Sequence, residues 1–333
     1  MKPLSAGAAL STDAVDAIIG GFRFREHESV SKDEIRGRLS DRGYGFRTLK
    51  PEGANARILA ADCAIAYREL RYHAIWAAHA VAIACTFDGK PHPDTLVGNG
   101  ALPYGDLEHS SYVGAGEFIP YADLDVRGNS ARVAFESSST LNAHRESVSE
   151  GKRPDIVLVD GSLYTNLMNL RKIDPIYPEN ADAISAYKGV LDIGKVVGMV
   201  EDSHATDLSR ELGYDYTNML LFDVALEPGE YLVDGREGIN ICHMKLPGKP
   251  LPHLPAGTSR PLTVRWEFNY GGFEDDLRRL ACMWLREDDV LHPQLYPLRI
   301  ADYLTRKIKA GGILDEVVGV RGLALKHREL REG

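Results

Sequence analysis

The chain has 333 residues, 44% of them hydrophobic and 26% charged, which excludes a collagen, a coiled-coil rod and a disordered tail. It carries 39 Lys and Arg against 48 Asp and Glu, a formal charge of −9, so any DNA contact has to use a local basic groove. No stretch approaches the roughly 18–20 uninterrupted apolar residues of a membrane span, and we expect no membrane contact.

The first 50 residues are predicted to form a helical N-terminal extension, followed by one main domain over residues 51–333. Ser11-Thr12-Asp13 is expected to cap a helix over residues 14–19, and Ser31 a second helix that ends near Leu39.

A short apolar run follows at residues 57–62 and ends in the carboxylate of Asp62. Residues 69–87 are rich in Tyr, Ile, Trp and Val and are predicted to pair with it as a hairpin, although their alanines leave a helix open. Residues 90–125 contain Pro, Gly and Tyr without periodicity and are predicted to be an irregular insertion.

A helix is expected over residues 129–150, followed by four consecutive apolar residues between Asp155 and Asp160 that indicate a strand buried on both faces. A second such strand covers residues 195–200. A helix over 181–191 makes the two strands a parallel strand–helix–strand unit. Late strands are predicted at 239–246 and 262–269, and late helices at 273–285 and 300–308.

Three predicted strands end in or lead into carboxylates, namely Asp62, Asp160 and Asp202. Ligands of an open α/β sheet collect outside the strand ends, where acids from separate strands meet. Clustered carboxylates repel each other, and Mg²⁺ or Mn²⁺ relieves that repulsion because both prefer hard oxygen ligands. The alternative is that each Asp only ends a strand and caps a helix.

Two other enzyme classes do not fit the sequence. Haloacid-dehalogenase phosphatases need a nucleophilic Asp two residues before an Asp-Gly pair, and the residue two before Asp160-Gly161 is Leu158. The chain also has no Gly-x-x-x-x-Gly-Lys-Ser/Thr phosphate loop, so it is not itself an ATP-driven motor.

Six motifs follow one another between residues 57 and 310: Ile58-Leu59-Ala60-Ala61-Asp62, Glu136 on the predicted helix, Asp160-Gly161-Ser162-Leu163, Val197-Gly198-Met199-Val200-Glu201-Asp202-Ser203, Arg265-Trp266-Glu267-Phe268, and Tyr296-Pro297-Leu298-Arg299-Ile300-Ala301-Asp302. In this order and spacing they resemble the NurA family of nucleases, the partners of HerA-type DNA translocases.

The resemblance implies an α/β fold with an RNase H-like mixed sheet core flanked by helices, with the N-terminal extension and with insertions at 90–125 and 205–260. It implies that Asp62, Glu136 and Asp160 hold Mn²⁺ or Mg²⁺ and hydrolyse DNA, with Asp302 as a fourth catalytic residue. Glu146 on the same helix is the alternative to Glu136 as a ligand.

The resemblance also implies partners. They are DNA, a second copy of the chain in a homodimer that encloses a DNA channel, and a hexameric HerA-type ATPase that feeds DNA inward for DNA end processing or defence against phage. The candidate DNA-binding residues are Ser203, His204, Arg299 and Arg306; a solvated helix face is the alternative reading of the two arginines.

Three departures from the family pattern remain. Cys63-Ala64 replaces a Gly-Ser after Asp62, Glu201 replaces a Lys, and Asp302 stands at the position where the family usually has His. A catalytically degenerate adaptor that binds DNA or the motor without cleaving is therefore the alternative function. The four scattered cysteines and the absence of an apolar signal core predict a cytoplasmic location.

Overall fold

The computed structural model describes residues 31–70, 73–90, 103–119, 123–172, 177–200, 204–250, 259–287, 294–307 and 309–321. The chain divides into two compact units, Met1–Gly43 and Tyr44–Gly333. In the first unit, helix α2 (Lys32–Asp41) begins after Ser31, whose side chain accepts a hydrogen bond from the Glu34 amide, and this confirms the predicted cap. The helix predicted over residues 14–19 lies outside the described residues.

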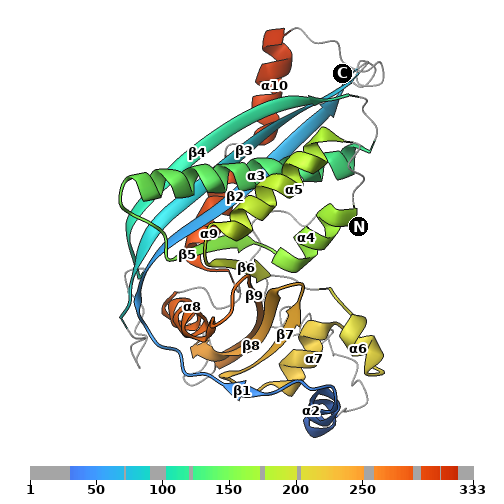
Figure 1. Cartoon of the computed structure of the whole chain (residues 1–333), viewed down its shortest axis with the longest axis vertical. Helices are drawn as coiled ribbons and strands as arrows, with labels where there is room; N and C mark the ends of the chain where they lie inside the picture. Colours follow the sequence, from blue (N-terminus) through green and yellow to red (C-terminus); the bar gives the residue numbers. More distant parts are fainter. Residues whose placement is uncertain are drawn as a thin grey trace, which may run out of the picture. The chain divides into compact units, whose positions relative to one another are not determined.

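The second unit is built on a nine-stranded mixed sheet in the order β1-β7-β8-β9-β6-β5-β2-β3-β4 (Figure 1). Its strands are β1 (Arg47–Thr48), β2 (Asn55–Glu69), β3 (Ala74–Asp88), β4 (Tyr104–Phe118), β5 (Ile156–Asp160), β6 (Val196–Val200), β7 (Glu230–Arg236), β8 (Ile239–Pro250) and β9 (Ser259–Phe268). Its helices are α3 (Leu124–Ser149), α4 (Leu163–Lys172), α5 (Pro178–Asp192), α6 (Asp207–Glu211), α7 (Asn218–Ala225), α8 (Glu274–Arg286), α9 (Tyr296–Lys307) and α10 (Ala310–Arg321). The predicted mixed α/β sheet flanked by helices is confirmed.

Strands β2, β3 and β4 form an antiparallel meander, while β5 and β6 run parallel to β2. The hairpin prediction is confirmed and its helical alternative is wrong, because β2 and β3 pair without a break from Asn55↔Asp88 to Glu69↔Ala74.

Two predictions of irregular or helical structure are wrong. Residues 104–118 of the predicted insertion form β4, an exposed edge strand whose glycines and polar residues hide it from hydrophobic patterning. Helix does not extend to residue 50 either, because Arg47–Thr48 form β1 against β7.

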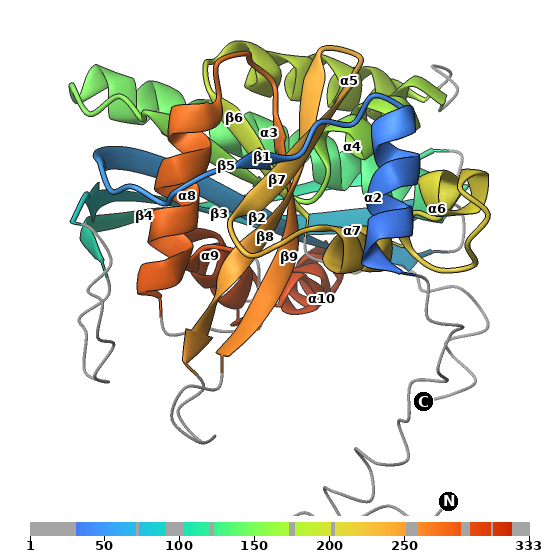
Figure 2. The ribbon, with the colours of Figure 1, turned by 90° about the horizontal axis from the view of Figure 1, so that it is seen from below.

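The core lies on both faces of the sheet. On one face, Leu59 and Ala61 of β2 pack with apolar residues of α3, α4 and α5; on the other, Ile58 and Ala60 pack with α8 and α9. This follows from the alternation of side chains along a strand. Figure 2 shows α3, α4 and α5 on one side of the sheet and α9 and α10 on the other. No helix among the described residues is long and apolar enough to cross a membrane.

Two glycines allow the chain to turn sharply after β5. Gly161 has a φ of 82°, a left-handed conformation that side chains disfavour. A Cβ on Gly198 of β6 would lie 2.7 Å from the Gly161 carbonyl oxygen and 2.8 Å from Cγ of Leu163. The bare backbone of β6 therefore leaves room for the turn that follows Asp160.

Candidate metal centre

Asp62 and Asp160 occupy adjacent positions on neighbouring strands. Parallel pairing of β2 with β5 ends at Ala61↔Val159, and Asp160 is the last residue of β5, so the two carboxylates come next on strands roughly 4.8 Å apart. Asp160 ends its strand as predicted. Asp62 does not, because β2 continues to Glu69 through its pairing with β3. No turn follows Asp62, so Cys63-Ala64 in place of Gly-Ser continues the strand.

Residues at the two ends of α9 hold both aspartates. Thr305 Oγ1 lies 2.5 Å from Oδ2 of Asp62, and Nε2 of Gln294, two residues before α9, donates to Oδ1 of Asp160 at 2.7 Å. Asp62 pairs with Val81, which packs against Ala301 of α9, so Asp62 belongs to the α9 face of the sheet. Hydrogen bonds of this kind fix the orientation of a ligand carboxylate.

Glu136 approaches from α3, on the opposite face. Its side chain is 9% exposed and accepts a hydrogen bond from Arg132 at 2.7 Å. The pKa of Glu136 is raised to about 8, chiefly by burial and also by the charges of Asp62 and Asp160, against the opposing effect of Arg132. The three carboxylates therefore interact electrostatically at the end of β5, where β2 continues without β5 as a neighbour.

Only one of the two helix glutamates shares this environment. Glu146 lies ten residues further along α3, which is about 15 Å of helix. Its carboxylate accepts a hydrogen bond from the Tyr112 hydroxyl at 3.0 Å. The structure therefore groups Glu136, and not Glu146, with the two aspartates.

Arg132 supplies the positive charge at this centre. The carboxylates of Glu136, Asp62 and Asp160 and the thiol of Cys63 raise the pKa of Arg132 against the effect of its burial. Burial, then the charge of Glu136, raises the pKa of Cys63, which keeps this thiol neutral. The sequence pattern did not single out Arg132, although its spacing of four residues from Glu136 on one helix is a signal for an ion pair.

The donor chemistry of the three acids fits a hard divalent cation, which prefers carboxylate oxygen. Glu136, however, lies on the opposite face of the sheet and is paired with Arg132. Accordingly, among the described residues no three His, Cys, Asp or Glu side chains stand close enough together to hold a metal ion as they are. Asp62 and Asp160 lie side by side on neighbouring strands, and Glu136 is close enough for their charges to raise its pKa.

The remaining predicted residues have other partners. Asp302 pairs with Arg306 at 2.7 Å, and Arg306 is 78% exposed. Arg299 pairs at 2.6 Å with Glu287, which is buried, so its guanidinium does not lie free on a helix face. Glu201, Asp202 and Ser203 lie outside the described residues.

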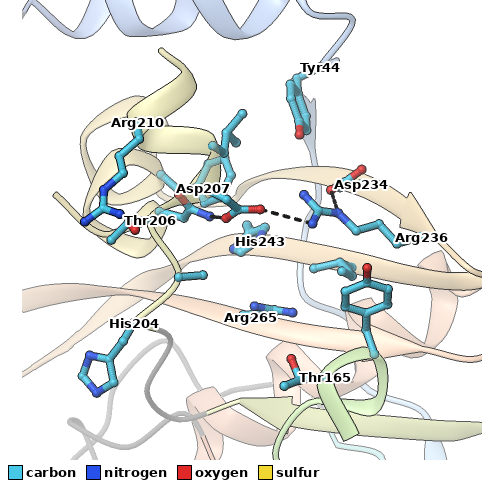
Figure 3. A pocket seen from close by; sticks show the side chains of 16 residues that line it. Tyr44, Thr165, His204, Thr206, Asp207, Arg210, Asp234, Arg236, His243 and Arg265 are labelled. Atoms are coloured by element: carbon cyan, nitrogen blue, oxygen red, sulfur yellow. Dashed lines mark hydrogen bonds and ion pairs between the residues drawn. The ribbon is translucent and has the colours of Figure 1, made fainter. Parts of the chain in front are cut away.

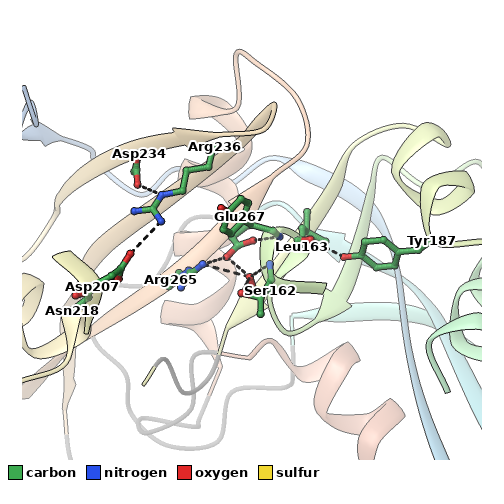
Figure 4. Close-up of polar contacts among 11 residues, drawn as sticks. Ser162, Leu163, Tyr187, Asp207, Asn218, Asp234, Arg236, Arg265 and Glu267 are labelled. Carbon is green, nitrogen blue, oxygen red and sulfur yellow. Dashed lines mark hydrogen bonds and ion pairs between the residues drawn. The ribbon is translucent and has the colours of Figure 1, made fainter. Parts of the chain in front are cut away.

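A polar network joins two of the sequence motifs, the turn after Asp160 and the Arg-x-Glu segment of β9, a connection that the sequence did not predict (Figure 4). Glu267 is fully buried and accepts hydrogen bonds at 2.8 Å from the Ser162 hydroxyl and the Tyr164 amide. Arg265 pairs with it at 2.5 Å. Because residues 265 and 267 share one face of a strand, their alternation was the available signal.

A cavity of about 430 Å³ adjoins this network (Figure 3). Exposed His204 and Arg210, and buried His243 beside Arg265, are among its lining residues. Of this group, the sequence indicated His204 as a DNA-binding residue and Arg265 as part of the Arg-x-Glu motif.

The sequence model of the NurA domain matches residues 96–301, more than half of the chain, a region that contains Glu136 and Asp160 but not Asp62. No curated protein matches the sequence.

Three solved structures are similar in fold. The NurA nuclease from Sulfolobus solfataricus is 15% identical, with a TM-score of 0.53 over 87% of this chain and 91% of that one. A NurA structure with manganese is 12% identical, with a TM-score of 0.51 over 92% and 98%. Another NurA structure is 11% identical, with a TM-score of 0.51 over 96% and 99%.

Proposed function

The chain belongs to the NurA family, and on this premise we propose that it is a divalent-metal-dependent nuclease that hydrolyses the phosphodiester bonds of DNA. The observation that carries the proposal is the alignment of Asp62 with Asp160 at the end of β5, with Glu136 coupled to both. The similar NurA structure solved with manganese supports Mn²⁺, with Mg²⁺ as the other suitable ion. We also infer that the strand order β4-β3-β2-β5-β6 is an RNase H-like core.

In this proposal Asp62, Glu136 and Asp160 hold the metal. The bound cation would activate the attacking water and neutralise charge that develops on the phosphate. Thr305 and Gln294 orient the two aspartates from their hydrogen bonds, and Arg132 offsets part of the carboxylate charge. To hold the cation, Glu136 would have to leave its ion pair with Arg132.

A matched pair of substitutions on one helix tests this site. We expect Glu136→Gln to abolish Mn²⁺-dependent cleavage of single- and double-stranded DNA, and Glu146→Gln to retain it. EDTA should stop the wild-type reaction and added Mn²⁺ should restore it. Equal activity of the two variants would remove Glu136 from the site. DNA binding without cleavage by a folded wild-type protein would favour the adaptor.

Several finer expectations remain proposals. The family resemblance supports a homodimer around a DNA channel, a HerA-type ATPase as partner, and a role in DNA end processing or phage defence. A cytoplasmic location, the catalytic role of Asp302 and DNA contacts by Ser203, His204, Arg299 and Arg306 also stay predictions. Arg306 is the more exposed of the two arginines. Light scattering of the purified chain tests the dimer directly.

A further inference from the structure

The cavity introduced above lies beside the turn that follows Asp160. Its wall includes Arg265 of β9, which reaches the Ser162 hydroxyl at 3.4 Å, and Ser162 stands two residues after Asp160. Tyr164 and Thr165, at the start of α4, line the cavity as well. The turn that follows Asp160 therefore leads from the candidate metal centre to the wall of this cavity. Its volume of about 430 Å³ falls in the range of small-molecule sites, about 300–1,000 Å³.

The mouth of the cavity carries cationic and proton-donating groups. Arg236 forms ion pairs with Asp234 at 2.6 Å and with Asp207 at 3.3 Å, and Arg265 forms one with Glu267. Arg210 has no ion-pair partner within the part of the chain that the structure describes, and it is exposed, as is His204. Both stand on the same side of the cavity in Figure 3. Among the residues that the structure describes, Arg210 thus has no counter-charge and can pair with an anion.

The floor carries an unsatisfied polar group. His243 of β8 is 6% exposed and pairs in register with Arg265, and its ring centroid lies 4.0 Å from that of Phe222. Its Nδ1 atom is buried without a hydrogen-bond partner among the described residues. Buried polar atoms normally have partners, so this atom points to a ligand or water that enters the cavity. Burial and the nearby Arg265 and Arg236 hold the pKa of His243 well below its usual value, so the ring is neutral and each nitrogen can donate or accept according to tautomer.

We propose that this cavity binds one nucleotide of the DNA strand that lies at the metal centre, with its phosphate at Arg210 and His204 and its base edge at His243. A nucleotide combines an anion with a planar ring that carries donors and acceptors, which matches a cationic mouth and a polar atom on an otherwise apolar floor with Phe222 and Ile241. A simple anion would leave His243 unmatched. The proposal rests on the nuclease function.

Binding of thymidine 5′-monophosphate to the full chain in EDTA tests the cavity without the metal. We expect calorimetry to show saturable binding to the wild type, and binding at least about tenfold weaker to Arg210→Gln, because a charge-assisted contact is lost. Arg171→Gln, which removes an exposed arginine of α4 that pairs with Glu237, is the matched control and should bind like the wild type. Equal affinity of the Arg210 variant and the wild type, or no binding at all, would overturn the proposal.

His243→Phe tests the floor while it keeps a ring against Phe222. We expect weaker nucleotide binding from this variant, and wild-type affinity in a folded variant would overturn the role of His243. If His243→Phe fails to fold, the exposed Arg210→Gln variant still tests whether the cavity binds the nucleotide. Pentathymidylate should displace the mononucleotide; failure to displace it would overturn the assignment to a strand.

The outcome is separable from that of the nuclease proposal. Asp160→Asn should retain nucleotide binding in EDTA, because the cavity does not use the metal. If binding instead requires Mn²⁺ and disappears in Asp160→Asn, the nucleotide binds only at the metal centre and the cavity proposal fails while the nuclease stands. Binding that depends on Arg210 in a protein without cleavage activity supports the cavity and refutes the nuclease.

Discussion

Asp160 is positioned by the strand that precedes it rather than by its own carboxylate. The four apolar residues of β5 before it are buried, and only Asp160 reaches partial exposure at the end of the strand. We expect Asp160→Asn to reduce cleavage by at least about a hundredfold, because a hard cation loses a charged ligand, while the fold is retained. Cleavage assays with circular dichroism as the folding control measure both effects.

The two readings of this residue predict opposite results. Asn adopts the same turn conformations as Asp, so a purely structural aspartate would tolerate the change. Wild-type cleavage by folded Asp160→Asn protein would make the residue a turn former.

His243 gives the stability of the protein a pH dependence at the scale of one side chain. Burial, then Arg265 and Arg236, holds the pKa of His243 well below its usual 6.5. The unfolded chain takes up a proton on this ring below about pH 6.5 and the folded protein does not, so stability that is present above that pH is lost as pH falls. One such proton contributes up to about 1.4 kcal/mol per pH unit.

The comparison with His243→Phe isolates this effect from the other histidines. We expect the free energy of unfolding of the wild type, relative to that of the variant, to fall from pH 8 to pH 5, as measured by urea unfolding at each pH. If the free energies of unfolding of the two proteins changed with pH in parallel, the contribution of His243 would be refuted.

At the scale of elements, α9 is fixed at its start by one buried carboxylate. Glu287 is 1% exposed and accepts hydrogen bonds from the Tyr104 hydroxyl at 2.6 Å, the Tyr296 amide at 2.8 Å and Arg299 at 2.6 Å. It thus ties the start of α9 to β4, and α9 in turn carries Thr305 to Asp62.

We expect Glu287→Ala to destabilise the fold by about 3–5 kcal/mol, because it removes the buried carboxylate that pairs with Arg299. Arg306→Ala is the control on the same helix and should cost no more than about 1 kcal/mol, since the pair of Arg306 with Asp302 is largely exposed. Urea unfolding of both variants measures the difference, and similar losses would contradict the buried role of Glu287.

Patterns of neighbouring residues predicted the elements whose structure is decided locally. The continuous apolar runs of β5 and β6 identified buried strands, and Asp160 followed as the end of one. Strand β4 escaped prediction because its glycines and polar side chains carry no such pattern; its strand conformation depends on β3 as a partner. Asp62 was misplaced at a strand end for the same reason, since pairing with β3 extends β2 beyond its apolar segment.

The support of the candidate site depends on contacts that sequence patterns do not encode. Thr305 is 243 residues from Asp62 and Gln294 is 134 residues from Asp160. Neither hydrogen bond has a local signature, because it arises only when α9 packs on the folded sheet. Glu136 was chosen from the family resemblance, and its burial and its coupling to the aspartates appear only in the structure.

At the scale of the whole molecule, the formal charge of −9 opposes the capture of DNA from solution. We therefore expect a HerA-type ATPase with ATP to raise the cleavage rate at least about tenfold, because a tethered partner raises the effective concentration of DNA at the nuclease. Cleavage of linear duplex DNA with the motor, with the motor lacking ATP, and without the motor measures this. Equal rates under the three conditions would refute the dependence.

The place of Asp62 in the middle of a 15-residue strand also has a consequence for the movement of the proposed ligands. Backbone amides within a long, paired ladder exchange with solvent only through extensive unfolding, whereas short strand ends open locally. Asp62 belongs to the first kind of segment, and Asp160, followed at once by Gly161, to the second. We expect the cation to enter and leave through brief opening at the end of β5 while Asp62 keeps its place, so that metal exchange is faster than the hydrogen exchange of β2.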